Sequence, residues 1–501
     1  MDKISIAQDR IEFQKEQDHL LKTILDVRYF QPWKRRVPTE RDEVPKGSLE
    51  LFLTPTCNQK CEYCYLQKYP DLYPAEINNK ETIITNLKKI LDWCIKEEFL
   101  LPNLDLFSGE IWHTNYGLEI LDIVYDYIVN KGLMCLSVTI PTNGTFFHNP
   151  KQIVEIQNRL DNFKAIQCPI TISFSVDGKY VEDEARPLND NTLVRDDAFY
   201  DRLFTFAKHN GYGFHPMLAA CSAKDWVKNF DWWVTMLRRY DLPMDRLMLL
   251  EVRNNDWTEE TIKDYQQVIR HIFEFTWDYY EGNIPEVLND LILYNQVYET
   301  KTNKRDDLIL WGEKVSYIPI TTNETKGFYG CTISTHLTVR VGDLAICPCH
   351  RSAYNKYLYG RFTLDEHGEI AGVQANNPQL AVNILMLDNR KAVLGCDSCI
   401  LNDICLGTCK GQSIESCSDP LRNDPVVCNF LQKKYEFIFD LYEEKGIMTW
   451  LEENCTKYHA TNHIWSKYVR TWQVIKEERE YAKLAEFRQN FYGRCNSDGD
   501  N

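Results

Sequence analysis

Residues 49–65 read LELFLTPTCNQKCEYCY, a short strand pattern that runs directly into a loop with three cysteines. A brief, mostly apolar run followed by turn residues is typical of a buried β-strand. The loop places Cys57, Cys61 and Cys64 in the spacing C-x3-C-x2-C. Three thiolates from one tight loop can hold a [4Fe–4S] cube and leave its fourth iron open to another ligand. The alternative is a zinc knuckle that lacks its fourth ligand.

Strand and helix patterns alternate about six times around and after this loop. Apolar residues at helical spacing, as in 80–98, separate the strand-like runs. These runs occur at residues 49–54, 103–107, 136–141, 171–176, 215–220 and 247–252. Repeated βα units predict an α/β protein with a parallel sheet and right-handed crossovers, here a partial (β/α)6 TIM-type barrel. In such barrels the active site lies at the C-terminal ends of the strands.

Composition limits where the protein works and what it binds. The net charge of −16 argues against a nucleic-acid partner, since phosphate binding relies on Lys and Arg. The N-terminal segment lacks the apolar core of a signal peptide, and no uncharged apolar run is long enough to span a membrane. We therefore expect a cytoplasmic protein without a membrane partner. Eighteen cysteines in a reducing compartment indicate metal ligands rather than disulfides.

The ends of the second, third and fourth strand runs carry small or polar residues, where a barrel would place its site. With the aromatic residue before the last cysteine of the loop and an arginine further on, these are Tyr63, Ser108, Gly109, Glu110, Asn143, Ser175, Asp177 and Arg186. Each has an ordinary explanation, because Asn-Gly and Asp-Gly are turn signals and a Glu after a strand favours a helix N-terminus. Their order at successive strand ends favours a common site.

In this combination, residues 49 to about 255 resemble the radical S-adenosylmethionine (SAM) superfamily. The family motif is CxxxCxxC with an aromatic residue before the last cysteine, matched by Tyr63. The resemblance implies a [4Fe–4S] cluster on Cys57, Cys61 and Cys64, with SAM on the open iron and the eight residues above as SAM contacts. Ser108 departs from the first glycine of the family's GGE motif.

A second group of cysteines lies in residues 331–430. Cys331, Gly342 and Cys347 are followed by the spacing C-x2-C-x5-C-x3-C and a last cysteine. This pattern is similar to the seven-cysteine SPASM domain, although two zinc sites are the alternative. The resemblance implies two auxiliary [4Fe–4S] clusters. The first, Aux I, would use Cys331, Cys347 and Cys409; the second, Aux II, would use Cys396, Cys399, Cys405 and Cys428.

The fourth ligand of Aux I stays open on the sequence alone. Cys349 or Cys417 could complete it, or one iron could remain open, and the close spacing of Cys347 and Cys349 favours the open site. In sulfatase-maturating relatives an Asp that acts as general base follows the second Aux I cysteine. Pro348 stands there in this chain, which disfavours formylglycine formation. The remaining candidate bases are Asp177, His350 and Glu251.

These patterns divide the chain into an N-terminal helical extension (1–48), a barrel (49–255), a helical linker (256–330), a loop-rich auxiliary-cluster domain (331–430) and a helical tail (431–501). The resemblance implies an oxidoreductase that cleaves SAM reductively to a 5′-deoxyadenosyl radical. Its expected substrate is a peptide or protein, modified by crosslinking, thioether formation or epimerisation, as in the maturation of ribosomally made peptides.

Expected partners are a reductant such as flavodoxin or ferredoxin and a separate leader-binding protein. The alternatives are a radical SAM enzyme for a small molecule or nucleobase, and a non-catalytic iron–sulfur electron carrier.

Overall fold

The structure, a computed structural model, describes most of the 501 residues. The described residues are 3–34, 47–68, 78–247, 249–285, 287, 336–386, 396, 398–401, 404–405, 409–454 and 468–483. Cys331, Cys455 and Cys495 lie outside them.

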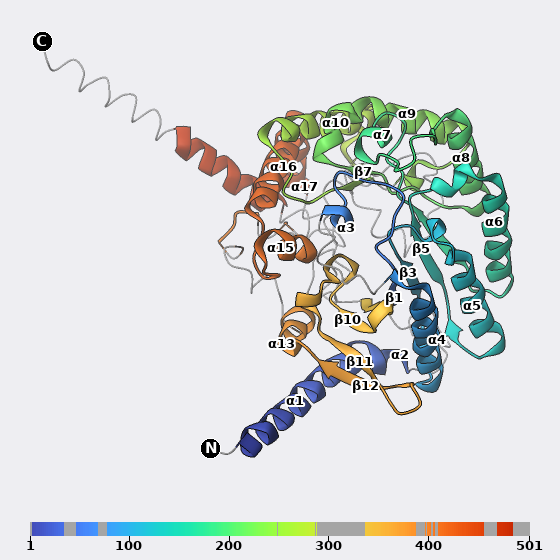
Figure 1. Cartoon of the computed structure of the whole chain (residues 1–501). Helices are drawn as coiled ribbons and strands as arrows, with labels where there is room; N and C mark the ends of the chain where they lie inside the picture. Colours follow the sequence, from blue (N-terminus) through green and yellow to red (C-terminus); the bar gives the residue numbers. More distant parts are fainter. Residues whose placement is uncertain are drawn as a thin grey trace, which may run out of the picture.

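A parallel sheet forms the centre of the molecule (Figure 1). Its strands β1 (Ser48–Phe52), β3 (Leu104–Phe107), β5 (Val138–Thr142) and β6 (Ile170–Phe174) lie side by side in that order, all parallel. Each strand is separated from the next along the chain by a helix, so the crossover connections match the βα repeat in the sequence. The predicted α/β class with a parallel sheet is confirmed.

Two further segments continue this sheet beyond β6. Parallel bridges join Phe174 to Phe214 and Phe214 to Leu247. Beyond these bridges, β7 (Met217–Leu218) and β8 (Leu250–Glu251) pair in parallel as a separate ladder. Six parallel segments therefore occur in the described residues at the six places that the sequence predicts.

Amphipathic helices cover the outside of the sheet (Figure 1). They are α4 (Lys80–Lys96), α5 (Gly117–Asn130), α6 (Pro150–Ala165), α8 (Asp197–Asn210), α9 (Trp226–Arg239) and α10 (Glu259–Tyr279). Helix α9 shows the pattern, since Trp226, Phe230, Trp233 and Leu237 recur three or four residues apart and are all fully buried. Side-chain oxygens cap several of these helices, as Asn149 does for α6.

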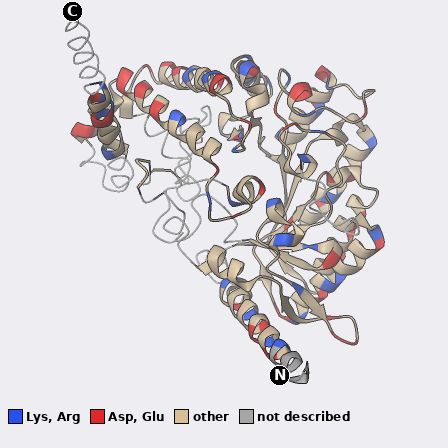
Figure 2. Ribbon diagram, turned by 60° about the vertical axis from the view of Figure 1, so that its left-hand side comes forward, with Lys and Arg blue, Asp and Glu red and all other residues tan. Residues whose placement is uncertain are grey.

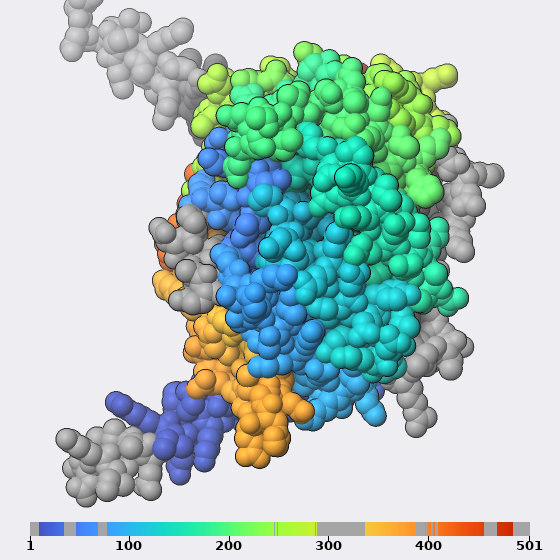
Figure 3. Space-filling view, turned by 45° about the vertical axis from the view of Figure 1, so that its right-hand side comes forward, coloured from blue at the N-terminus to red at the C-terminus, as the bar shows by residue number. Residues whose placement is uncertain are grey.

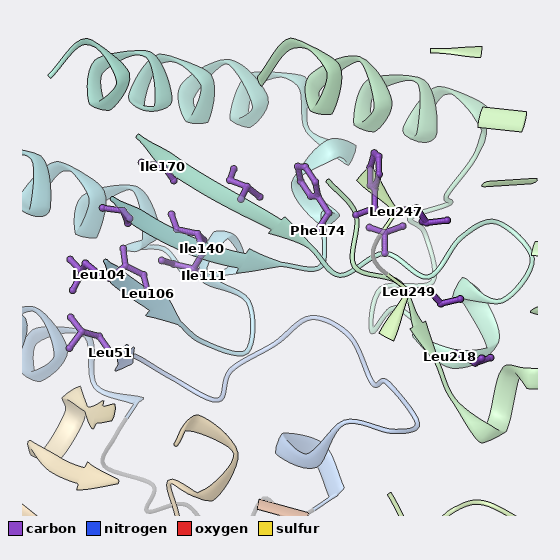
Figure 4. Close-up of a cluster of buried hydrophobic side chains, with 14 of the residues drawn as sticks. Leu51, Leu104, Leu106, Ile111, Ile140, Ile170, Phe174, Leu218, Leu247 and Leu249 are labelled. Atoms are coloured by element: carbon purple, nitrogen blue, oxygen red, sulfur yellow. The ribbon is translucent and has the colours of Figure 1, made fainter. Parts of the chain in front are cut away.

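Alternate residues of each strand face these helices and form the core (Figure 4). Leu51, Leu104, Leu106 and Ile140 are fully buried there. Because side chains alternate across a strand, the opposite face of β1 carries Ser48, Glu50 and Phe52. This opposite face leads to the site described below.

Residues 336–375 add four more strands to the same sheet. Strand β9 (His336–Arg340) pairs in parallel with β1, and β10 (Ala345–Cys347), β11 (Gly360–Leu364) and β12 (Ile370–Ala375) follow in antiparallel order. The sequence predicts a loop-rich segment here, because the strands are short and turns and cysteines separate them. The structure shows one continuous eight-stranded sheet from β12 to β6.

The first and last helices pack on this framework. Helix α1 (Lys3–Leu25) lies beside β12, where the Gln14 amide donates to the Ala375 carbonyl (3.0 Å) and the Ala375 amide donates to Asp18 (2.7 Å). Figure 3 shows α1 and the β11–β12 hairpin side by side, and basic and acidic side chains alternate along α1 in Figure 2. The short segments η1 (Asp26–Phe30) and α2 (Gln31–Trp33) follow, and they bury Trp33 in the core.

Helix α16 (Pro425–Glu444) packs against α10. Phe430 stacks on Trp257, with ring centroids 4.3 Å apart. Helix α17 (Ile447–Asn454) and the helical residues 468–483 extend from it. Among the described residues, none of the helices combines the length and apolar character that crossing a membrane requires.

Candidate active site

A cavity of about 460 Å³ opens at the C-terminal ends of β1, β3 and β5. The structure brings three cysteines and six further predicted site residues together in its wall. They are Cys57, Cys61, Cys64, Tyr63, Ser108, Gly109, Asn143, Ser175 and Arg186. These residues come from four segments far apart in the sequence, and they meet where a parallel α/β sheet places its ligand sites.

The end of β3 locks the cysteine loop in place. The Gly109 amide donates to the Thr54 carbonyl (2.7 Å), and the Glu110 amide donates to the Thr56 carbonyl (2.9 Å). A Cβ atom on residue 109 would lie 2.3 Å from the Thr56 carbonyl oxygen, which no side chain tolerates. Glycine at 109 is therefore required for the close approach of the two loops.

The end of β5 also contacts the cysteine loop. The Asn143 side-chain amide donates to the Asn58 side-chain oxygen (2.8 Å) and lies 3.7 Å from the Cys57 sulfur. The Asn143 side-chain oxygen accepts from the Thr145 amide (3.0 Å), which fixes its orientation. Asn143 is thus placed as a hydrogen-bond donor to one of the three thiolates.

Glu110 lies behind the cavity wall rather than in it. Its carboxylate is fully buried and accepts hydrogen bonds from the Thr142 hydroxyl (2.9 Å), the Asn143 amide (2.6 Å) and the Trp112 amide (3.1 Å). Burial raises the pKa of Glu110 to about 7, against the lowering effect of these donors. In this structure Glu110 braces the turn after β5, next to Asn143.

Asp177 is likewise fully buried and serves to join segments. Its carboxylate accepts from the Tyr63 hydroxyl (2.6 Å), the Arg186 guanidinium (3.3 Å) and the Met217 amide (2.7 Å). Burial raises the pKa of Asp177, although Arg186 and the Tyr63 hydroxyl act in the opposite direction. The sequence predicts SAM contacts at Glu110 and Asp177, and the structure places both one layer outside the cavity.

The chemistry of the loop thiols fits a metal cluster. Burial raises the pKa of Cys57 to about 11 and that of Cys61 to about 12. Without a metal these thiols would stay protonated and would be weak nucleophiles. Binding to iron supplies the positive charge that makes thiolates stable in such a site.

The opposite wall of the cavity comes from residues 349–351 and 409. Cys349, His350, Arg351 and Cys409 all line it. Cys347 does not: its side chain is 1% exposed and packs in an apolar cluster with Phe52 and other residues. The cavity therefore extends from the cysteine loop after β1 to the second cysteine group.

His350 is held at this wall by Glu50, which lies on the interior face of β1. The His350 ring nitrogen Nδ1 is 2.7 Å from one Glu50 oxygen, and the His350 backbone amide donates to the other (3.0 Å). The ring stacks on Phe107 at 4.0 Å between centroids. Burial disfavours the charged imidazole, but the Glu50 carboxylate outweighs burial and raises the pKa of His350.

Sequence reasoning missed Glu50. The signal was an acidic residue in the middle of an otherwise apolar strand, LELFL, where a buried carboxylate needs partners. The partners are His350 and the Thr338 hydroxyl, which donates at 2.7 Å from β9. They come from a part of the chain almost 300 residues later, so only the fold reveals the contact.

Glu251, the third candidate base, is fully engaged. It accepts from Lys434, from Arg253 and from the Tyr265 hydroxyl, all at 2.7–2.8 Å. Its carboxylate is buried, which raises its pKa, but the two cations have the larger effect together and lower it. Glu251 therefore connects β8 to α16. Because its oxygens already accept from these donors, its carboxylate is a weak candidate for accepting a proton.

The four cysteines expected for Aux II gather near the start of α16. Burial raises the pKa of Cys428 to about 12, and Cys405, Cys396 and Cys399 raise it further, so the four thiols lie within electrostatic range. The Asn423 side-chain amide donates to the Cys396 sulfur at 2.9 Å. Four thiols around one position fit a closed [4Fe–4S] site.

Cys417 lies on the Aux II side. Its thiol donates to the backbone carbonyl of Asn423 (3.8 Å), the residue whose side-chain amide contacts Cys396, and Cys417 does not line the cavity.

Comparison with solved structures shows that the fold of this chain is similar to that of known radical SAM enzymes. The particular structures are two of anSMEcpe, an anaerobic sulfatase-maturating enzyme. One, with bound AdoMet and Cp18Cys peptide, aligns at a TM-score of 0.50 and 15% identity, over 79% of this chain and 98% of that one. The other, with bound AdoMet, has a TM-score of 0.50 and 14% identity over the same shares.

A scan against protein-family models finds no match, and a search of curated proteins finds none either. At this level of identity the structural alignment establishes the fold, and the activity has to be argued from the site.

Proposed function

We propose that the chain is a radical SAM enzyme that cleaves SAM reductively and oxidatively modifies a peptide or protein. The observation that carries this proposal is the cavity wall, where three loop cysteines meet Ser108, Asn143, Ser175 and Arg186 at the strand ends. A carrier of electrons needs no such pocket beside its cluster. The fold shared with the anSMEcpe structures supports the same class of chemistry.

The six parallel segments would form the partial (β/α)6 barrel of residues 49–255, with the site at its open end. Residues 331–430 would form the SPASM-type auxiliary domain, and strands β9–β12 would join it to the barrel sheet. The remaining segments would have the roles that the sequence predicts. They are an N-terminal helical extension (1–48), a helical linker (256–330) and a helical tail (431–501).

Cys57, Cys61 and Cys64 would hold the first [4Fe–4S] cluster, and their shared place in the cavity wall fits this role. When bound, the cluster supplies the electron that cleaves SAM. Tyr63, Ser108, Gly109, Asn143, Ser175 and Arg186 would bind and orient SAM within the cavity. Glu110 and Asp177 would act behind them, since they hold Asn143 and Arg186 in position.

Two auxiliary [4Fe–4S] clusters would complete the enzyme. Cys396, Cys399, Cys405 and Cys428 fit a closed Aux II. Cys331, Cys347 and Cys409 are proposed for Aux I, with Cys331 outside the described residues. Cys349 lines the same cavity as Cys409, whereas Cys417 lies beside Asn423. Cys417 is therefore disfavoured as the fourth ligand of Aux I, which leaves Cys349 or an open iron.

The cavity favours a peptide substrate over the alternatives. It runs from the SAM side to the wall of Cys349 and Cys409, so a side chain could enter between the two clusters. One of the anSMEcpe structures holds a peptide. His350 and Glu251 both line the cavity, but Glu251 pairs with Lys434, and Asp177 lies behind the wall and pairs with Arg186. We therefore propose His350 as the base. A small-molecule substrate is the second candidate, and the bond formed would be a crosslink, a thioether or an inverted stereocentre.

Reconstitution under anaerobic conditions tests the proposal. The protein should bind about twelve irons in three [4Fe–4S] clusters. With SAM and dithionite it should release 5′-deoxyadenosine and methionine. Changing Cys57, Cys61 and Cys64 together to Ala should remove about four irons and all SAM cleavage. Flavodoxin or ferredoxin should replace dithionite as reductant, and a separate leader-binding protein should increase turnover of a peptide substrate.

Stoichiometric zinc without iron would overturn the proposal. If the protein binds iron but does not cleave SAM, a non-catalytic electron carrier is the better-supported function. Loss of cleavage in the triple variant, with the auxiliary irons retained, would assign the activity to the loop after β1.

A further inference from the structure

We infer that the pair Arg351–Glu415 sets the reduction potential of Aux I through the sulfur of Cys409. This inference rests on the proposed function, because it requires that Cys409 binds a cluster. It concerns residues that belong to neither sequence motif. Arg351 lines the cavity beside Cys409, and Glu415 lies on α15 (Lys410–Cys417), six residues beyond that cysteine.

The contacts of Arg351 fix the direction of its guanidinium group. Its Nε and Nη2 atoms donate to the two oxygens of Glu415, at 3.0 and 2.7 Å, in a bidentate pair. The Nη2 atom also donates to the Gln412 side chain at 2.6 Å. The third nitrogen, Nη1, points to the Cys409 sulfur at 3.9 Å. A planar guanidinium held on two sides in this way has little freedom to turn from the sulfur.

Further contacts hold the pair in place. Glu415 is 1% exposed and also accepts from the Tyr354 hydroxyl at 2.9 Å. The Arg351 guanidinium lies over the Tyr65 ring, 5.5 Å from its centroid. Tyr65 directly follows Cys64, so Arg351 stands between the loop of the first cluster and the ligand of the second. A buried charge pair at this point is costly to assemble, which argues for a role beyond simple packing.

Hydrogen bonds to ligand sulfurs and nearby charges are the main protein controls on the potential of an iron–sulfur cluster. A cation beside a thiolate ligand stabilises the reduced cluster, which carries one more negative charge, and raises the potential. The buried carboxylate of Glu415 opposes it. Arg351 and Glu415 should therefore shift the potential in opposite directions, although both support the same local structure.

The test uses the full chain, reconstituted with iron, in the Cys57/Cys61/Cys64→Ala background that removes the first cluster. Redox titration followed by electron paramagnetic resonance gives the potentials of the two auxiliary clusters. Arg351→Gln should lower one of them, with up to about a tenfold fall in the equilibrium constant for reduction, about 59 mV for one electron. Glu415→Gln should raise the same potential. Arg351→Lys, which keeps the charge, should lie nearer the unsubstituted value.

Arg159→Gln is the matched control. Arg159 also makes a bidentate pair, with Asp122 (2.9 and 2.7 Å), but on the outer surface far from the cysteines. It should leave both potentials unchanged. If Arg351→Gln does not fold, Glu415→Gln and Arg351→Lys carry the test.

The outcomes separate the inference from the proposed function. Full auxiliary iron with both potentials unchanged in Arg351→Gln and Glu415→Gln overturns the inference alone. A shift of the same sign in both variants indicates general loosening of the site, and it also overturns the inference. Protein that never binds auxiliary iron overturns the proposed function itself.

Discussion

The Lys434 ammonium group lies 2.7 Å from both carboxylate oxygens of Glu251, and its side chain is fully buried. This contact joins β8 to α16, the helix that begins beside the cysteine group of Cys396, Cys399, Cys405 and Cys428. Burial disfavours the charged amine and lowers the pKa of Lys434 to about 8, against the effect of Glu251. The ion pair is thus a buried link between β8 and α16.

Replacement of Lys434 by Met should destabilise the docking of α16, because it leaves Glu251 buried with one partner fewer. We expect a cost of about 3–5 kcal/mol, measured by urea unfolding and by limited proteolysis around residue 425. Lys433→Met is the control, since Lys433 pairs with Glu259 at the surface and should change stability by about 0–1 kcal/mol. Equal effects of the two substitutions would contradict this account of the interface.

Glu110→Ala should weaken SAM binding and also lower stability. The substitution leaves the Asn143 and Trp112 amides without their acceptor, at about 1–3 kcal/mol for each buried group. Because Asn143 lines the cavity, the SAM dissociation constant should rise as the turn after β5 loosens. Isothermal titration with SAM and thermal unfolding measure the two effects. Unchanged SAM affinity in a destabilised variant would show that Glu110 has no role in the cofactor site.

Cys417→Ala should retain all iron, because its thiol contacts the Asn423 carbonyl and lies off the cavity. Cys349→Ala tests the open iron of Aux I. With an open site it should retain about twelve irons and most SAM cleavage. Loss of about four irons in Cys349→Ala alone would identify Cys349 as the fourth ligand and exclude a substrate thiolate at that iron.

The Glu50–His350 pair should make stability depend on pH. The pKa of His350 is raised in the folded protein, so the pair contributes stability that is present below the ordinary histidine pKa of about 6.5. That contribution is lost as the pH rises through the higher folded value. Histidine hydrogen–deuterium exchange should show the raised pKa, and Glu50→Gln should lower it. An unchanged exchange profile in Glu50→Gln would contradict the pairing.

The barrel half could be predicted from sequence because its strands and helices keep a regular pattern. The run LELFLT and the five later runs each gave a strand or bridge at the expected place. Strands β9–β12 escaped prediction because no helical pattern separates them along the chain, and turns such as the left-handed Leu344 interrupt them. Strand β9 is stabilised by pairing with β1, which lies far away in the sequence. The local residue pattern could not reveal that pairing.

The same limit applies to the site. Strand order predicted which segments meet, and Ser175 and Asn143 do line the cavity. Periodicity does not fix how a loop turns after a strand, so it could not show that Glu110 and Asp177 face inward to backbone amides. Arg351 and Glu50 were missed because single charged residues carry no motif.

The parallel pairing of β9 with β1 has a consequence for anyone dividing this protein. A fragment that stops before residue 336 would leave the cysteine-loop strand β1 as an unpaired sheet edge. Exposed edges of apolar strands invite pairing with other chains, and β1 is buried along its whole length. The isolated first half should therefore aggregate, and the segment from residue 336 is a structural part of the sheet that carries the cysteine loop rather than an appendage that can be removed.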